Sequence, residues 1–214
     1  MDKTNIIEIN NLSKIIQGVS ILSNINVNFK SGNIYGIIGK NGSGKSMLFK
    51  AICGLINPTQ GEIKVFNENI NGGNFPKETG VIIENPGFLQ KYSGFKNLKI
   101  LANINNRITD IDIKNTLSLV GLNSEDKRPV KKYSLGMKQK LGIAQAIMEK
   151  PKLLILDEPM NALDQESVEN MRSLILNLKK NGTTILLCSH NKEDIETLSD
   201  HIYIMECGVI RNIN

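Results

Sequence analysis

The residue types best suited to chemistry lie in one short run near the N-terminus. It fits the pattern G-x-x-x-x-G-K-[ST] and reads Gly39, Lys40, Asn41, Gly42, Ser43, Gly44, Lys45 and Ser46. Its glycines permit backbone angles closed to other residues, so successive N–H groups can turn inward around phosphate oxygens. Lys45 would reach the β and γ phosphates of a nucleoside triphosphate, and Ser46 would ligate Mg²⁺. We expect Met47, the next residue, to contact the nucleotide as well.

A second candidate group is a pair of carboxylates directly after the apolar run 153–156. In open α/β sheets ligands bind beyond the carboxyl ends of the strands. Asp157 would hold Mg²⁺, directly or through water, and Glu158 could orient and deprotonate a water for attack on the γ-phosphate. The alternative is a strand that ends in Asp-Glu because it has reached solvent. The phosphate-binding run makes the catalytic interpretation the better one.

A sheet is needed to position these groups, and the sequence predicts an α/β fold with a mainly parallel sheet. Four apolar runs have too little alternation for one exposed face and are predicted as buried strands: 34–38, 81–83, 153–156 and 183–187. Alternating runs predict a smaller N-terminal antiparallel sheet: 6–9, 24–29 and 62–66. A C-terminal hairpin is predicted from 202–205 and 209–210.

Helical patterns predominate between the two prolines Pro86 and Pro151. The predicted helices are 94–105, 111–120 and 135–148, and a further one, 47–53, follows the phosphate-binding run. We therefore expect a single domain over residues 1–214. Its core would be about 1–85 and 151–214, with a helical insertion at about 86–150.

Composition indicates a cytoplasmic chain. No apolar run approaches the roughly 20 residues that span a bilayer, and the N-terminus enters the apolar run 6–9 without the layout of a secretory signal. The net charge is +5 with a pI near 9.0, but the lysines are scattered, which favours a solvated surface over a nucleic-acid site. Cys53, Cys188 and Cys207 lack metal-like spacing and are interpreted as reduced packing residues.

Further motifs make the chain resemble the ATP-binding subunits of ABC transporters. The run 133–139, YSLGMKQ, resembles the ABC signature, and it lies shortly before the acidic strand. Residues 157–164 resemble the family's Walker B and D-loop, and His190 resembles its switch histidine. The likeness covers essentially the whole chain, with the motifs in the family's order and spacing. His201 belongs to no motif and is interpreted as structural.

The resemblance implies a P-loop NTPase core, with ATP and Mg²⁺ as cofactors. Two such domains would pack head to tail, so that each ATP lies between one subunit's phosphate loop and the other's signature. Ser134 and Gly136 would then touch the γ-phosphate in trans, and Asp164 of the D-loop would join the nucleotide site. His190 would meet the γ-phosphate with its ring. The resemblance further implies a transmembrane permease as partner and a place on the inner face of the cell membrane.

Two positions depart from the family pattern. The family has an aromatic residue that stacks on adenine where this chain has Ile15 and Ile16, so that Ile16 would offer only an apolar surface. Glu84 stands where the family has the Q-loop glutamine, and we expect it on the Mg²⁺ side of the nucleotide. The alternative is that Glu84 points into solvent or toward the permease. This variant resembles ABC ATPases of peptide-antibiotic export and immunity.

The sequence therefore predicts the ATPase subunit of a bacterial ABC exporter. Two other classes stay open at this point. One is a soluble ABC ATPase that acts on DNA or ribosomes, although those carry two ATP domains or a long coiled coil, and neither is present here. The other is a nucleotide-binding regulator without turnover, which the carboxylate pair Asp157 and Glu158 disfavours.

Overall fold

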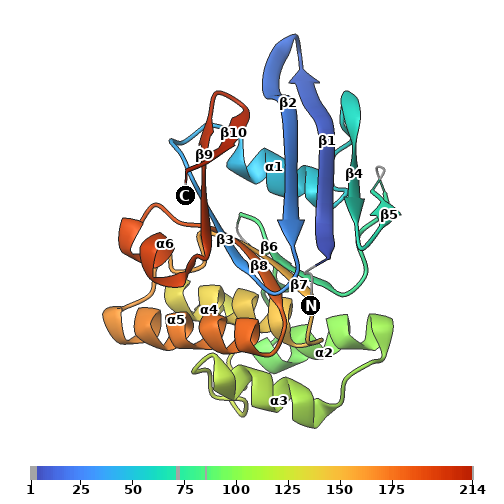
Figure 1. The fold of residues 1–214 in the computed structure, drawn as a ribbon. Coiled ribbons are helices and arrows are strands. Elements are labelled where there is room, and N and C mark those ends of the chain that lie inside the picture. The colour runs from blue at the N-terminus through green and yellow to red at the C-terminus, as the bar shows by residue number, and fades with distance from the viewer. Residues whose placement is uncertain (1–3, 71–72, 85, 214) are drawn as a thin grey trace.

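The fold consists of two β-sheets and a group of helices (Figure 1). The structure is a computed structural model, and it describes residues 4–70, 73–84 and 86–213. The larger sheet has the order β10-β9-β3-β8-β7-β6. Its strands are β3 (Ile34–Ile38), β6 (Thr79–Ile82), β7 (Leu153–Asp157), β8 (Thr184–Cys188), β9 (His201–Glu206) and β10 (Val209–Asn212). All neighbours in it are parallel except β10, which pairs antiparallel with β9.

The smaller sheet is antiparallel and has the order β2-β1-β4-β5. It is built from β1 (Asn5–Ile16), β2 (Val19–Lys30), β4 (Gln60–Val65) and β5 (Glu68–Asn69). The first two strands form a long hairpin, which carries the N-terminal part of the chain well beyond the edge of the larger sheet (Figure 1).

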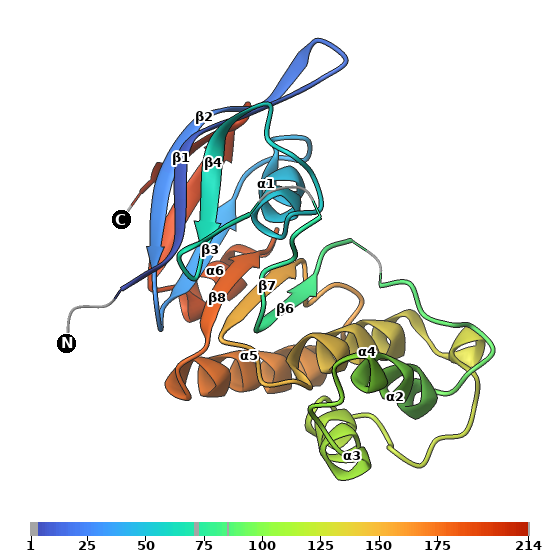
Figure 2. The same cartoon turned by 90° about the vertical axis from the view of Figure 1, so that its right-hand side faces the viewer.

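Six α-helices and one 3₁₀ turn complete the part of the chain that the structure describes. They are α1 (Lys45–Ile52), α2 (Gly94–Asn105), α3 (Asp110–Leu119), η1 (Val130–Lys132), α4 (Leu135–Ile147), α5 (Gln165–Lys180) and α6 (Lys192–Leu198). Figure 2 shows α1 close to the antiparallel sheet, with α2 to α5 gathered on the other side of the larger sheet. Among the described helices, none is long and apolar enough to cross a bilayer.

The larger sheet is covered on both faces, which explains why its strands lack alternation. Along β7, Leu153 and Ile155 belong to a core shared with α1 and the antiparallel sheet. Leu154 and Leu156 belong to the second core, which the helices α2 to α5 complete. Every apolar residue of this strand is therefore buried, whichever way its side chain points.

The fold class and most of the predicted elements are confirmed. Helix α2 begins and ends at the predicted residues, and Ser93 caps it by accepting a hydrogen bond from the Lys96 N–H. Four elements were missed: β5, η1, α5 and α6. The signal for α5 is present, because Asp164 is a suitable N-cap and its apolar positions Met171, Leu174 and Ile175 follow helical spacing.

Candidate active site

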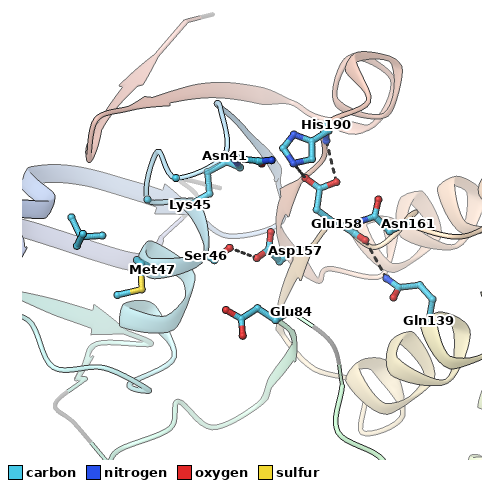
Figure 3. Close-up of a pocket in the computed structure, with 13 residues that line it drawn as sticks. Asn41, Lys45, Ser46, Met47, Glu84, Gln139, Asp157, Glu158, Asn161 and His190 are labelled. Carbon is cyan, nitrogen blue, oxygen red and sulfur yellow. Dashed lines mark hydrogen bonds and ion pairs between the residues drawn. The ribbon is translucent and has the colours of Figure 1, made fainter. Parts of the chain in front are cut away.

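A cavity of about 570 Å³ opens at the carboxyl ends of the parallel strands (Figure 3). The strands β3, β8 and β7 are parallel neighbours, so the segments that follow them emerge at one edge of the sheet. The cavity is lined by Ile21, Asn41, Gly42, Gly44, Lys45, Ser46, Met47, Glu84, Gln139, Asp157, Glu158, Asn161 and His190. The phosphate-binding run, the carboxylate pair and the switch histidine thus meet in one place.

The phosphate-binding run turns tightly between β3 and α1. Gly44, the N-cap of α1, has a φ of 109°, which side chains rarely adopt. A Cβ at Gly39 would lie 2.3 Å from the carbonyl oxygen of Met205, so only glycine fits there. Gly39 and Ser43 belong to this loop but do not line the cavity. Within the described chain, the buried Ser43 hydroxyl has no hydrogen-bond partner.

Lys45 is held at the loop by the backbone of the loop itself. Its buried ammonium group donates to the carbonyl oxygens of Gly39 at 2.8 Å and Lys40 at 3.2 Å. The N-terminus of α1 points N–H groups to the same place, and such a terminus attracts anions. This end of the cavity therefore suits the phosphates of a nucleotide.

Ser46 and Asp157 form a pair of oxygen donors suited to a hard cation. The Ser46 hydroxyl donates to Oδ2 of Asp157 at 2.5 Å, although 111 residues separate them in sequence. Within the described ranges, no group of three or more His, Cys, Asp or Glu side chains could hold a metal. Mg²⁺ is often bound by one or two protein oxygens together with water and substrate phosphates. The donor set therefore fits Mg²⁺ at a phosphate site.

Glu158 is oriented by the loop that carries His190. The backbone N–H of His190 donates to Oε2 of Glu158 at 3.1 Å, and its Nε2 lies 3.2 Å from Oε1 (Figure 3). Glu158 has a φ of 54°, a conformation that costs about 1 to 3 kcal/mol in a non-glycine residue and that clusters at active sites. Its carboxylate faces the cavity beside Asp157, where an attacking water could be deprotonated.

Three lining residues were missed in the sequence. Gln139 donates from Nε2 to the carbonyl oxygens of Glu158 at 3.1 Å and Pro159 at 3.0 Å, so it holds the turn after β7. Its place at the end of the signature-like run was the available signal. Asn161 and Ile21 also line the cavity. Asn161 lies within the run 157–164 that resembles the Walker B and D-loop, whereas nothing in the immediate sequence marks Ile21.

Ile16, the predicted adenine contact, does not line the cavity. It ends β1 at the tip of the long hairpin, is 40% exposed and is absent from the residues that line the cavity. The apolar lining comes instead from Ile21, in the second strand of that hairpin, and from Met47. An adenine contact of Ile16 therefore stays a prediction, and the lining of this cavity does not include that residue.

Glu84 lines the same cavity as Ser46 and Asp157, but its carboxylate is paired elsewhere. Lys50 in α1 lies 2.6 Å from Oε1 of Glu84, and the Glu84 side chain is 63% exposed. Like Glu158, Glu84 has a positive φ, at 60°. Glu84 therefore lies beside the cavity, as expected, but its carboxylate is also largely exposed to solvent, as in the alternative.

Ser134, Gly136 and Asp164 lie in a second cavity, of about 440 Å³, that shares no lining residue with the first. Ser134 caps α4 by accepting from the Met137 N–H at 3.1 Å, which leaves the positive end of that helix facing the second cavity. Hydrogen bonds from Ser167 lower the pKa of Asp164, the N-cap of α5. The phosphate-binding run and the signature-like run therefore lie at two separate cavities of the same chain.

The histidine and the cysteines without a motif are mostly structural. His201 stacks on Tyr35 with ring centroids 5.2 Å apart. Cys53 and Cys188 are buried, and burial raises the pKa of the Cys53 thiol to about 12. The packing interpretation was wrong for Cys207, which is exposed in the turn between β9 and β10.

Comparison with known sequences identifies the family. The family described as "ABC transporter" matches residues 22–161. The uncharacterized ABC transporter ATP-binding protein YybJ of Bacillus subtilis is 48% identical over 203 residues, or 94% of this chain and 93% of that protein. The lantibiotic transport ATP-binding protein SrtF of Streptococcus pyogenes is 40% identical, over 95% and 89%. The bacitracin transport ATP-binding protein BcrA of Enterococcus faecalis is 39% identical, over 98% and 69%.

Solved structures share the fold. The ATP-binding cassette MJ0796, a dimer in a post-hydrolysis state with ADP and Pi, superposes with a TM-score of 0.88 at 21% identity, covering 97% of this chain and 98% of that one. The chain cbiO1 of the cbiONQ transporter complex from Clostridium perfringens gives 0.80 at 26% identity, covering 97% and 87%. The chain therefore belongs to the ABC transporter family, as one of its ATP-binding and ATP-hydrolysing subunits.

Proposed function

We propose that this ATPase subunit powers a bacterial exporter of peptide antibiotics, acting from the cytoplasmic face of the membrane on a separate permease. The observation that carries the proposal is the cavity that joins Lys45, the pair Ser46 and Asp157, and the pair Glu158 and His190. The antibiotic class is supported by the printed names of SrtF and BcrA. Glu84 in place of glutamine agrees with the resemblance found in the sequence.

Each group in the cavity has a proposed part in hydrolysis. Lys45 binds the β and γ phosphates, and the loop N–H groups hold their remaining oxygens. Ser46 and Asp157 would hold Mg²⁺, which neutralises phosphate charge when bound. Glu158 takes a proton from the attacking water as the bond between the γ-phosphorus and the bridging oxygen breaks. His190 holds the Glu158 carboxylate in place and turns its ring toward the γ-phosphate when ATP is bound.

The second cavity would be completed by another subunit. We propose a head-to-tail dimer in which Ser134, Gly136 and Asp164 of one chain face the phosphate loop of the other. Their separation from the first cavity within one chain supports this arrangement. The single domain 1–214 would dock on the permease through its insertion, about 86–150. The exposed Leu89 and Tyr92, just before α2, supply apolar surface for that contact.

A growth assay tests the export function. Cells that depend on this chain and its permease should lose protection against bacitracin or a lantibiotic when the chain carries Glu158→Gln. Equal growth of the variant and wild-type strains over a concentration series of both antibiotics would contradict the proposed substrate class. A salt-dependent affinity of the purified chain for DNA or RNA would favour the nucleic-acid alternative instead.

The structure sharpens a prediction about Glu84. At about 4 Å and an effective dielectric near 20, a carboxylate is repelled by a phosphate charge by roughly 4 kcal/mol, and Mg²⁺ between them reverses the sign. An exposed ion pair such as Lys50 with Glu84 is worth only about 0.2 to 1 kcal/mol. Bound Mg²⁺ should therefore attract the Glu84 carboxylate more strongly than Lys50 does. ATP affinity should depend on Mg²⁺ more steeply in wild type than in Glu84→Gln.

Nucleotide titrations with Mg²⁺ and with chelator measure this dependence. Lys50→Met, which frees the Glu84 carboxylate, should make the dependence steeper still. Lys99→Met is the matched control, because Lys99 pairs with Asp110 at 2.7 Å on the exposed surface, and neither residue lines the cavity. An equal Mg²⁺ dependence in wild type, Glu84→Gln and Lys50→Met would leave Glu84 as a contact for the permease.

A further inference from the structure

A buried charge pair lies next to the loop that carries His190. Arg172 in α5 donates from Nε at 2.9 Å and from Nη2 at 2.7 Å to Oδ1 of Asp194 in α6. The two side chains are only 6% and 1% exposed. A buried charge that loses its partner is strongly destabilising. Arg172 therefore stabilises the carboxylate of Asp194 at this position, and the carboxylates of Glu193 and Asp194 raise the pKa of Arg172 in return.

The other oxygen of Asp194 holds the loop between β8 and α6. Oδ2 accepts a hydrogen bond from the hydroxyl of Ser189 at 2.8 Å. That hydroxyl also accepts from the backbone N–H of Asn191 at 3.1 Å, so it bridges the residues on both sides of His190. Ser189 is itself buried. The backbone of residues 189–191 is thus attached to the ion pair through one hydroxyl group.

This loop also contacts the Glu158 carboxylate. The backbone N–H and the Nε2 of His190 both contact that carboxylate, at 3.1 Å and 3.2 Å. A shift of the loop would move both contacts together. Misplacement of a reacting group by about 1 Å can cost about a hundredfold in rate. The buried pair is thus connected to the Glu158 carboxylate through the loop, although neither Arg172 nor Asp194 lines the cavity.

We propose that Arg172, Asp194 and Ser189 are positioning residues for hydrolysis, which act on Glu158 through the backbone of the His190 loop. This inference rests on the proposed role of Glu158 as the base. It also gives α5 a connection to the base, since the N-cap of this helix, Asp164, lines the second cavity and the helix carries Arg172 about two turns later.

Ser189→Ala is the most informative variant, because it releases the loop and leaves the ion pair intact. We expect kcat to fall about tenfold, while KM and the equilibrium affinity for Mg-ATP stay at their wild-type values. Ser189→Thr, which keeps the hydroxyl, should restore most of kcat. Lys179→Met is the matched control, since it removes another ion pair of α5, with Asp200 at 2.5 Å, that lies away from the loop. Its kcat should equal that of wild type.

A double variant separates this proposal from the role of Glu158. In a Glu158→Gln background, Ser189→Ala should cause no further loss of the residual rate, because the two act as one unit. A wild-type kcat in Ser189→Ala, a further loss in the double variant, or a failure of Ser189→Thr to restore kcat would overturn the positioning role. Wild-type turnover by Glu158→Gln alone would instead overturn the assignment of the base.

Discussion

Glu158→Gln should bind ATP as wild type does but fail to hydrolyse it. The glutamine keeps the shape of the side chain and an oxygen that can accept from the His190 N–H, which lies 3.1 Å from Oε2 in wild type. It loses the basic carboxylate. General base catalysis contributes about 10² to 10⁴ in rate, so phosphate release should fall by a factor in that range. Without hydrolysis, the ATP-bound dimer should accumulate, whereas wild type stays mainly monomeric.

Size-exclusion chromatography in saturating Mg-ATP, together with a phosphate-release assay, checks this expectation. Glu68→Gln is a suitable control, because Glu68 is an exposed carboxylate in β5, outside the cavity lining. It should hydrolyse and elute as wild type does. A Glu158→Gln protein that remains monomeric under saturating ATP, or that releases phosphate at the wild-type rate, would show that Glu158 is not the base.

Lys45→Ala and Ser134→Arg should separate binding from hydrolysis. Lys45 is expected to donate to the phosphates, and a charge-assisted hydrogen bond is worth about 1.5 to 3 kcal/mol. Its loss should weaken ATP binding by about 10- to 150-fold. Ser134 lies in the second cavity, which shares no residue with the first. Ser134→Arg should therefore leave the affinity of one subunit nearly unchanged and abolish hydrolysis by blocking the dimer interface.

Ser93→Arg controls for the lost helix cap. Ser134 and Ser93 both cap a helix through the N–H three residues on, at 3.1 Å and 3.3 Å. Loss of either cap costs about 1 kcal/mol, but only Ser134 lines the second cavity. Equilibrium titration with a nucleotide that is not hydrolysed measures the affinities. If Lys45→Ala and Ser134→Arg lose ATP to the same degree, Ser134 belongs to its own subunit's site and the head-to-tail dimer is wrong.

The sequence by itself determined the elements whose cause is local. The phosphate-binding run is recognisable because its glycines, lysine and serine act within eight consecutive residues. The bounds of α2 were predictable because Ser93 is a cap next to the first helical residue. The strand β7 was predictable because both of its faces are buried, so that apolar residues run on without a break until the two carboxylates.

Helix α5 was not predicted from the sequence. Its polar residues outweigh its apolar ones, and its buried face includes Arg172, a residue type that is almost never buried unless it is paired. The partner, Asp194, lies 22 residues further along the chain. The contact that stabilises Arg172 is therefore absent from the local sequence, which shows only the N-cap Asp164 and the helical spacing of the apolar positions.

Only the tertiary structure decided the contacts of the site. It brought Ser46 to Asp157 across 111 residues and placed Ile21, instead of Ile16, in the cavity lining. It also paired Glu84 with Lys50, 34 residues away. Capping, turns and periodic burial depend on neighbours a few residues apart, so a sequence displays them. Contacts between distant residues depend on how whole strands and helices pack, and that is settled only when both cores form together.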